Sequence, residues 1–287
     1  MAKVKIQGHA SGTGVVTVTA PNTSTDRTIT LPDATCTLAD NSDVTTKLPL
    51  AGGDMTGALE IQTAQVTGQF DRDCFLRLHP SAHTNSGGFT NMMFGTSTTN
   101  NYGVAIGGLR AGTDNAPSFR INMLNDSVSG FNALTIDSTG AVTMPKQPAF
   151  SAQTSGGFSL SSTNTLLTIP YNSERFDQNA DFNTSTYTFT APVTGKYQFN
   201  VITRLDNVDI AATYYHVYFT TSNRNYYDIF DPRGFDQDLG YLGLTVPCLA
   251  DMDANDTAIV KIYQAGGAVQ TTIAGTTDSH FSGYLVC

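Results

Sequence analysis

The second half of the chain alternates between apolar and polar residues with a period of two. In residues 197–201, 215–219 and 281–285, apolar residues or glycine occupy the odd-numbered positions. Such alternation places the apolar residues on one face of a β-strand. Strand-like segments recur about every ten residues with turn residues between them, which is typical of a β-sandwich or jelly roll. We therefore predict a jelly-roll head over residues 147–287.

Residues 61–146 contain shorter segments of the same kind, separated by Asn, Ser and Gly. The sequence Asp137-Ser138-Thr139-Gly140 is typical of a type I turn and ends this region before Val142. We predict a small β-rich middle domain from the segments 74–78, 102–106, 119–123 and 133–137.

Residues 1–60 combine short Thr- and Val-rich segments with a glycine-rich stretch at 48–59. The segments 14–19 and 28–31 are bounded by Pro, Asn and Asp, as strands are. Each carries only two or three apolar side chains, too few to offset the entropy lost on ordering. We expect these strands to form only in an oligomer, as an attachment and shaft segment with a bend at the glycines.

The composition supports an all-β protein whose partner is neither nucleic acid nor an anionic membrane. Of 287 residues, 40% are hydrophobic and only 14% are charged, and the net charge is −9. A chain without a basic face is a poor partner for nucleic acid or an anionic membrane. No apolar run approaches the roughly 18 residues of a membrane span, and no secretory signal follows Met1. We therefore expect a soluble protein with no membrane insertion.

Several motifs in the second half resemble the globular head of complement component 1q. They are PAFSA (148–152), IPYN (169–172), RFD (175–177), FTAPVTGKYQF (189–199) and FSGYL (281–285). The resemblance implies a ten-stranded jelly roll, related to the tumour-necrosis-factor ligands, that assembles as a trimer. Two features depart from the family: there is no Gly-X-Y stalk, and residues 184–186 replace its usual glycine.

The first half resembles tail-fibre and virion proteins of tailed phages, especially marine ones. The matching motifs are GTGVVTVTAPNT (12–23), DRTITLPDAT (26–35), LPLAGGDMTGAL (48–59) and ALTIDSTG (133–140). This resemblance implies an intertwined homotrimeric fibre that is assembled in the host cytoplasm and becomes part of the virion. Its N-terminal segment attaches to other virion proteins, and its head adheres to a host-surface glycan or protein.

The chain lacks the usual signatures of an enzyme or a cofactor site. It contains no G-x-S-x-G, H-E-x-x-H, P-loop or complete G-x-G-x-x-G motif. Asp251, Asp253 and Asp256 resemble the start of a calcium loop, but the required Gly and Glu are replaced by Asp256 and Ile262. We interpret them as a hairpin turn, with a calcium site as the alternative. No cofactor and no catalytic residue are predicted.

The loop around residues 228–238 is the most distinctive candidate for recognition. Aromatic rings stack on sugars, while carboxylates and arginine form hydrogen bonds with hydroxyl groups. The alternative is an ordinary acidic loop whose Phe residues pack into the core. Tyr214, Tyr215, Tyr218, Tyr226 and Tyr227 form a second aromatic set, for which we favour a core or subunit-interface role. The candidate receptor-binding residues are Tyr226, Tyr227, Phe230, Asp231, Arg233, Phe235, Asp236 and Asp238.

These observations leave three functions to compare. The favoured one is a trimeric phage tail fibre whose head binds a host receptor. The second is a head fibre or decoration protein attached to the capsid or neck, with the head acting mainly as a trimerisation clamp. The third is a glycan depolymerase with a carboxylate pair such as Asp231 and Asp236, but nothing repeats at the period of the long β-helices typical of such enzymes.

Overall fold

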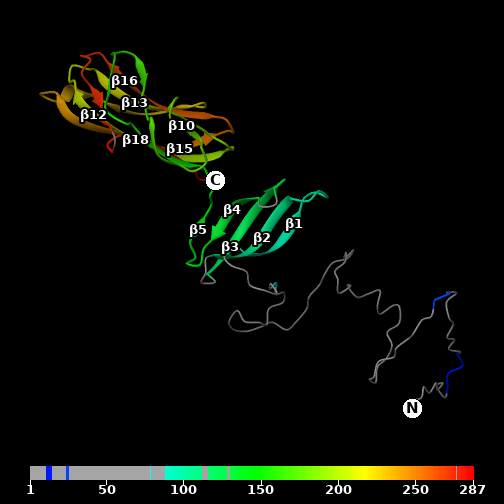
Figure 1. The fold of residues 1–287 in the computed structure, drawn as a ribbon. Coiled ribbons are helices and arrows are strands. Elements are labelled where there is room, and N and C mark those ends of the chain that lie inside the picture. The colour runs from blue at the N-terminus through cyan, green and yellow to red at the C-terminus, as the bar shows by residue number, and fades with distance from the viewer. Residues whose placement is uncertain are drawn as a thin grey trace. The chain divides into compact units, whose positions relative to one another are not determined.

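The computed structural model describes residues 11–14, 24–25, 78, 88–111, 116–127, 130–275 and 277–287. The described strands all lie in Leu76–Cys287, one of the two units into which the chain divides (Figure 1). The strands predicted at 14–19 and 28–31, the glycine-rich bend at 48–59 and all of the segment 74–78 except Leu78, which is not in a strand, lie outside these residues. Within the described part of the chain, no helix is long and apolar enough to cross a bilayer.

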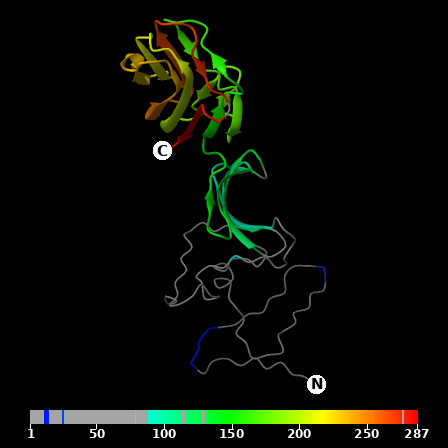
Figure 2. The ribbon, with the colours of Figure 1, turned by 90° about the vertical axis from the view of Figure 1, so that its left-hand side faces the viewer.

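The first described element is a five-stranded antiparallel sheet with its strands in sequence order. Figure 2 shows it as a single curved layer. The predicted segments 102–106 and 119–123 lie within strands, and 133–137 does so up to Ile136. Two strands were not predicted. One is Val142–Thr143, which has only two residues. The other is Phe89–Gly95, whose FTNMMFG sequence contains Asn and two Met where strands usually carry β-branched residues. The strands are β1 (Phe89–Gly95), β2 (Tyr102–Ala111), β3 (Ala116–Asn125), β4 (Phe131–Ile136) and β5 (Val142–Thr143).

The turn between β4 and β5 forms as its sequence predicts. The Gly140 N–H donates to the Asp137 carbonyl oxygen at 3.0 Å. The Asp137 carboxylate accepts hydrogen bonds from the Thr139 N–H and hydroxyl and from the Ala141 N–H. These bonds, led by the Thr139 hydroxyl, lower the pKa of Asp137. Gly140 has a φ of 88°, a left-handed conformation that glycine adopts without steric cost.

The head consists of two antiparallel sheets of six and seven strands, and within the described residues it contains no α-helix. Three of its strands, β7, β10 and β17, have only two residues, which leaves ten longer strands. The predicted all-β jelly-roll head is therefore confirmed. Its strands are β6 (Ala149–Gln153), β7 (Phe158–Ser159), β8 (Leu166–Thr168), β9 (Ser173–Asp177), β10 (Phe182–Asn183), β11 (Thr188–Thr190), β12 (Gly195–Val208), β13 (Tyr214–Thr221), β14 (Asn225–Phe230), β15 (Leu239–Met252), β16 (Thr257–Ala265), β17 (Thr272–Ile273) and β18 (His280–Leu285).

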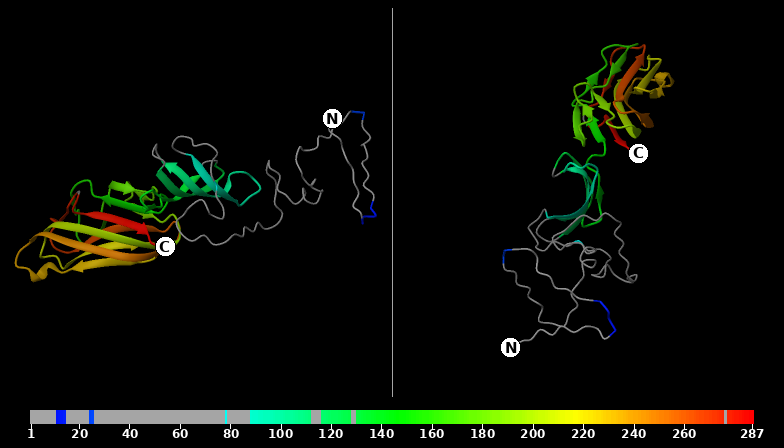
Figure 3. Two further views of the ribbon diagram at one scale, coloured as in Figure 1. Left: turned by 90° about the horizontal axis from the view of Figure 1, so that it is seen from below. Right: turned by 90° about the vertical axis from the view of Figure 1, so that its right-hand side faces the viewer.

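The two sheets lie face to face (Figure 3). An aromatic core fills the space between them. The ring of Phe199 on the seven-stranded sheet lies 4.7 Å from that of Phe219 on the six-stranded sheet. Phe150 stacks on Phe189 at 4.9 Å and meets Phe281 edge-on at the same distance. Alternate residues supply this core, as the period-two pattern predicts.

The FTAPVTGKYQF motif forms the corner that leads into the long strand β12. The chain bends at residues 192–194, and β12 begins at Gly195. The Tyr197 hydroxyl donates back to the Val193 carbonyl oxygen at 2.8 Å and holds the corner closed. A Cβ at Gly195 would lie 2.6 Å from the Cys287 carbonyl oxygen, so only glycine fits beside the chain's last residue.

Candidate functional site

The loop between β14 and β15 is organised by one aspartate and one arginine. Asp231 accepts a hydrogen bond from the Arg233 main-chain N–H and caps the short 3₁₀ helix Pro232–Gly234. The Arg233 guanidinium also donates to both Asp231 carboxylate oxygens, at 2.9 and 2.6 Å. These hydrogen bonds lower the pKa of Asp231 to about 2. The carboxylate and the guanidinium therefore bind each other at the loop surface.

The two phenylalanines of this loop lie in different surroundings. Phe230 is half-buried and packs against the core, whereas Phe235 is 48% exposed. Their rings lie 5.8 Å apart, so Phe235 extends the packed ring of Phe230 toward the surface. Phe230 therefore packs against the core, as the alternative interpretation expects, whereas a recognition role for the exposed Phe235 stays a prediction.

The two loop aspartates nearest β15 also differ. One Asp238 carboxylate oxygen accepts from the Ile210 N–H, and the other accepts from the Gln270 amide at 2.8 Å. These bonds lower the pKa of Asp238, the Ile210 bond most. Asp238 thus ties three loops together, while Asp236 is exposed at the surface.

Tyr226 and Tyr227, both candidate receptor-binding residues, point to opposite sides of their sheet and therefore do not share one surface. Successive residues of a strand alternate between faces. Tyr226 packs inward, with its ring 5.9 Å from that of Phe219. Tyr227 points outward and is 59% exposed. Tyr215, a member of the second aromatic set, is fully buried.

On the outer surface of the six-stranded sheet, five side chains form what we call the aromatic row. Their neighbouring ring centroids lie 4.7–5.9 Å apart. β13 contributes Tyr214, His216 and Tyr218, which are alternate residues on one face of the strand. β14 contributes Tyr227, which pairs with Tyr218, and β16 contributes Tyr263, which pairs with His216. The row comprises Tyr214, His216, Tyr218, Tyr227 and Tyr263.

His216 lies at the centre of the aromatic row. Its Nδ1 is hydrogen-bonded to the Tyr218 hydroxyl at 2.6 Å, and its ring stacks on that of Tyr227 at 5.2 Å. Burial lowers the pKa of His216 and raises that of Tyr218. The row offers ring faces together with tyrosine hydroxyls.

The residues of the predicted calcium loop lie at the turn between β15 and β16. The Asp256 carboxylate accepts from the Asp253 N–H at 2.8 Å and from the Asn223 amide at 3.0 Å. The Asp251 carboxylate forms an ion pair with Arg224 at 2.8 Å. In the described part of the chain, no group of three or more acidic, His or Cys side chains is placed to hold a metal ion.

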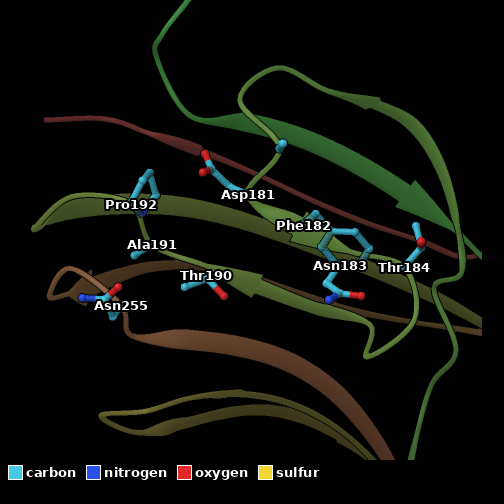
Figure 4. A pocket seen from close by; sticks show the side chains of 9 residues that line it. Asp181, Phe182, Asn183, Thr184, Thr190, Ala191, Pro192 and Asn255 are labelled. Atoms are coloured by element: carbon cyan, nitrogen blue, oxygen red, sulfur yellow. The ribbon is translucent and has the colours of Figure 1, made fainter. Parts of the chain in front are cut away.

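A pocket of about 480 Å³ opens beside β10 and β11, on a different part of the head (Figure 4). Its polar lining includes Asp181, Asn183 and Asn255. Burial raises the pKa of Asp181, although the Asn179 amide donates to its carboxylate. Asp181 is the one ionisable residue that lines the pocket, so the pocket contains no pair of carboxyl groups for acid–base chemistry.

The outer surface of the seven-stranded sheet, which we call the seven-stranded face, is uncharged at its centre. Three successive outward-facing rows of residues cross β15, β12 and β18, and they contain no Asp, Glu, Lys or Arg. Leu249 and Tyr284 flank Gln198 in one row, and both are exposed. Such a surface is typical of a protein interface. The nine residues are Gln198, Asn200, Ile202, Thr245, Pro247, Leu249, His280, Ser282 and Tyr284.

Comparison with known proteins finds a family that matches the head. Residues 149–286 match the C1q domain. The globular domain of zebrafish complement 1qA protein is 18% identical, with coverage of 49% of this chain and 98% of that one and a TM-score of 0.37. Murine APRIL, in a crystal structure at pH 8.5, is 10% identical, with coverage of 49% and 100% and a TM-score of 0.37. No curated protein matches the chain.

The C1q match confirms the predicted resemblance of the head. Residues 149–286 form a C1q-like jelly-roll domain, and C1q domains commonly form homotrimers. His216 and Tyr263 were not among the predicted binding residues, because neither lies in the loop of residues 228–238. The alternation of Tyr214, His216 and Tyr218 along one segment was the signal that could have located the aromatic row.

Proposed function

We propose that this chain is a homotrimeric fibre protein of a phage virion, whose C1q-like head binds a glycan or protein on the host surface. Its role is structural and adhesive, not enzymatic. Residues 1–60 attach the fibre to other virion proteins. The phage assignment is supported by the resemblance of residues 12–59 and 133–140 to tail-fibre proteins.

Support for a trimer comes from the seven-stranded face. An exposed surface with Leu249, Tyr284 and Ile202 and no charged residue at its centre is stabilised when it is covered. C1q/TNF domains commonly cover apolar surface by forming homotrimers. Three copies of one binding site then raise the avidity for a surface by about 10²–10⁴ without new contacts.

The observation that carries the receptor-binding proposal is the position of the aromatic row. It lies on the sheet opposite the seven-stranded face, so trimerisation through that face leaves the row accessible. Exposed tyrosine rings stack on the apolar faces of sugars or of protein side chains, and their hydroxyl groups form hydrogen bonds. Tyr is also enriched among residues that dominate binding energy.

The acidic loop supports adhesion better than hydrolysis. A glycosidase needs one carboxylic acid that stays protonated until it transfers its proton to the leaving group. Asp231 has a pKa of about 2 because it is held by Arg233, so it is ionised at neutral pH. Such a pKa does not suit the acid of a carboxylate pair with Asp236, the arrangement considered for a depolymerase.

The test uses the fluorescently labelled full-length chain on susceptible bacterial cells and on a glycan array. We expect Tyr227→Ala and Tyr263→Ala to weaken binding at least about tenfold, as the loss of a central tyrosine does at other interfaces. Val193→Ala is the control, because it shortens an exposed apolar side chain that lies outside both the aromatic row and the β14–β15 loop. Failure of the wild-type chain to label any susceptible cell would overturn the adhesive role.

The place of attachment is tested separately on intact particles. Antibody raised against residues 147–287 should mark the tips of tail fibres. Labelling of the capsid or neck would instead identify the chain as a head fibre or decoration protein.

A further inference from the structure

The five-stranded sheet has one face made almost entirely of apolar side chains. The strand register aligns Phe94, Val104, Met123 and Phe131 in one row across β1 to β4. The next two rows add mainly Ile, Leu, Phe, Met and Val. We call this surface the sheet face; it comprises Thr90, Met92, Phe94, Val104, Ile106, Gly108, Phe119, Ile121, Met123, Phe131, Leu134, Ile136 and Val142.

None of these side chains is buried within one copy of the chain. Phe94 is 55% exposed and Val142 is 56% exposed, and even Ile121 on the central strand is only half-buried. The opposite face has a different character, with Asn91, Arg120 and Thr135 among its residues. The sheet is therefore amphipathic, and its apolar side lacks a covering layer among the described residues.

The size of the sheet face is sufficient for an interface. Five strands spaced about 4.8 Å apart and about six residues long give a surface of roughly 400 Å² in projection. Contiguous apolar patches larger than a few hundred Å² on a protein surface mark interaction sites. A single-layered sheet also needs packing on one face to be stable.

Another copy of the chain fits this surface best. The sheet face carries no charged residue, so the partner must offer an uncharged apolar surface, which the same face of a second copy does. Only residues 144–148 separate β5 from β6, and five extended residues span at most about 18 Å. If three heads associate, three sheet faces are therefore held near one another at high effective concentration.

We propose that the sheet face is buried against the same face of other copies of this chain, as the core of a trimeric shaft next to the head. This inference rests on the trimer in the proposed function. It adds a second interface, built from β1–β5, that the C1q domain does not contain.

The test replaces Phe119 on the sheet face with the photocross-linker p-benzoylphenylalanine in the full-length chain. The matched control is the same replacement at Phe89, which lies on the opposite face. We expect Phe119→p-benzoylphenylalanine to give dimers and trimers on a denaturing gel, and Phe89→p-benzoylphenylalanine to give little product. Mixing isotope-labelled and unlabelled chains before refolding identifies products between copies by mass spectrometry.

Sedimentation of the same samples separates the two proposals. A trimer whose Phe119 probe gives no product, or only links to its own chain, overturns the sheet interface and leaves the trimeric head intact. Equal products from Phe89 and Phe119 also overturn it. A monomer in sedimentation overturns the trimer itself, and the sheet interface with it.

A second pair of variants tests the chemistry of the sheet face. Met92 and Asn91 are neighbours on β1 that point to opposite faces. A lysine buried in an apolar interface is strongly destabilising, so we expect Met92→Lys to reduce the Phe119 cross-link at least about tenfold. Asn91→Lys should leave the cross-link unchanged, and an equal loss in both variants would contradict the proposal.

Discussion

Gly283 is a position in the head where the structure leaves no room for a larger side chain. It lies on β18, and a Cβ there would come within 2.4 Å of Cδ1 of Phe199 and 3.0 Å of Cε1 of Phe150. Ordinary contacts of a Cβ begin at 3.4 Å, so the Phe199 ring would have to move by about 1 Å. That ring already packs against Phe219 at 4.7 Å, which leaves it little freedom to move.

We therefore expect Gly283→Ala to destabilise the head by about 2 kcal/mol, the usual cost of overpacking a core. For a domain of this size the melting temperature should fall by about 8 °C. Differential scanning calorimetry of the full-length chain measures the change. Gly240→Ala on β15 is the matched control, because its Cβ would meet no atom within 4 Å. Equal melting temperatures for Gly283→Ala and wild type would refute the packing argument.

Three further outcomes follow from the head. Tyr171→Phe removes a buried hydroxyl–hydroxyl hydrogen bond of 3.0 Å and should cost about 1 kcal/mol in urea unfolding, whereas an unchanged midpoint would contradict this. Burial lowers the pKa of His216 and His280, so the unfolded chain binds protons more readily and stability should fall below about pH 6.5. A double His-to-Gln variant should lose less stability between pH 7.5 and 5. Arg233→Ala should raise the pKa of Asp231 toward 3.8, as followed by NMR titration.

Local patterns in the sequence were sufficient to predict much of the fold. Period-two alternation located the core residues of β12, β13 and β18, because a strand with one buried face must alternate. The Asp137–Gly140 turn was also predictable, since its hydrogen bonds join residues at most four positions apart. β1 was missed because its Met- and Asn-containing sequence becomes a strand by pairing with β2.

The candidate site was less predictable than the fold. Residues 226–238 are adjacent in sequence, and composition alone marked them as a recognition loop. The structure divides them among a core contact at Tyr226, an ion pair at Asp231 and an outward ring at Tyr227. The division depends on which face of a sheet each residue occupies, and therefore on partners distant in the chain.

The all-β class, the jelly-roll head and the residues that fill its core could be inferred from the amino-acid sequence, because these depend on short-range alternation and turn chemistry. Which surfaces the protein presents became known only from the folded chain. Tyr227 joins His216 and Tyr263 in the aromatic row because β13 pairs with both β14 and β16. The sheet face likewise exists because β1–β5 pair in a register that aligns their apolar residues. Strand pairing joins residues that are far apart in the chain, and a linear pattern of residues does not contain that information.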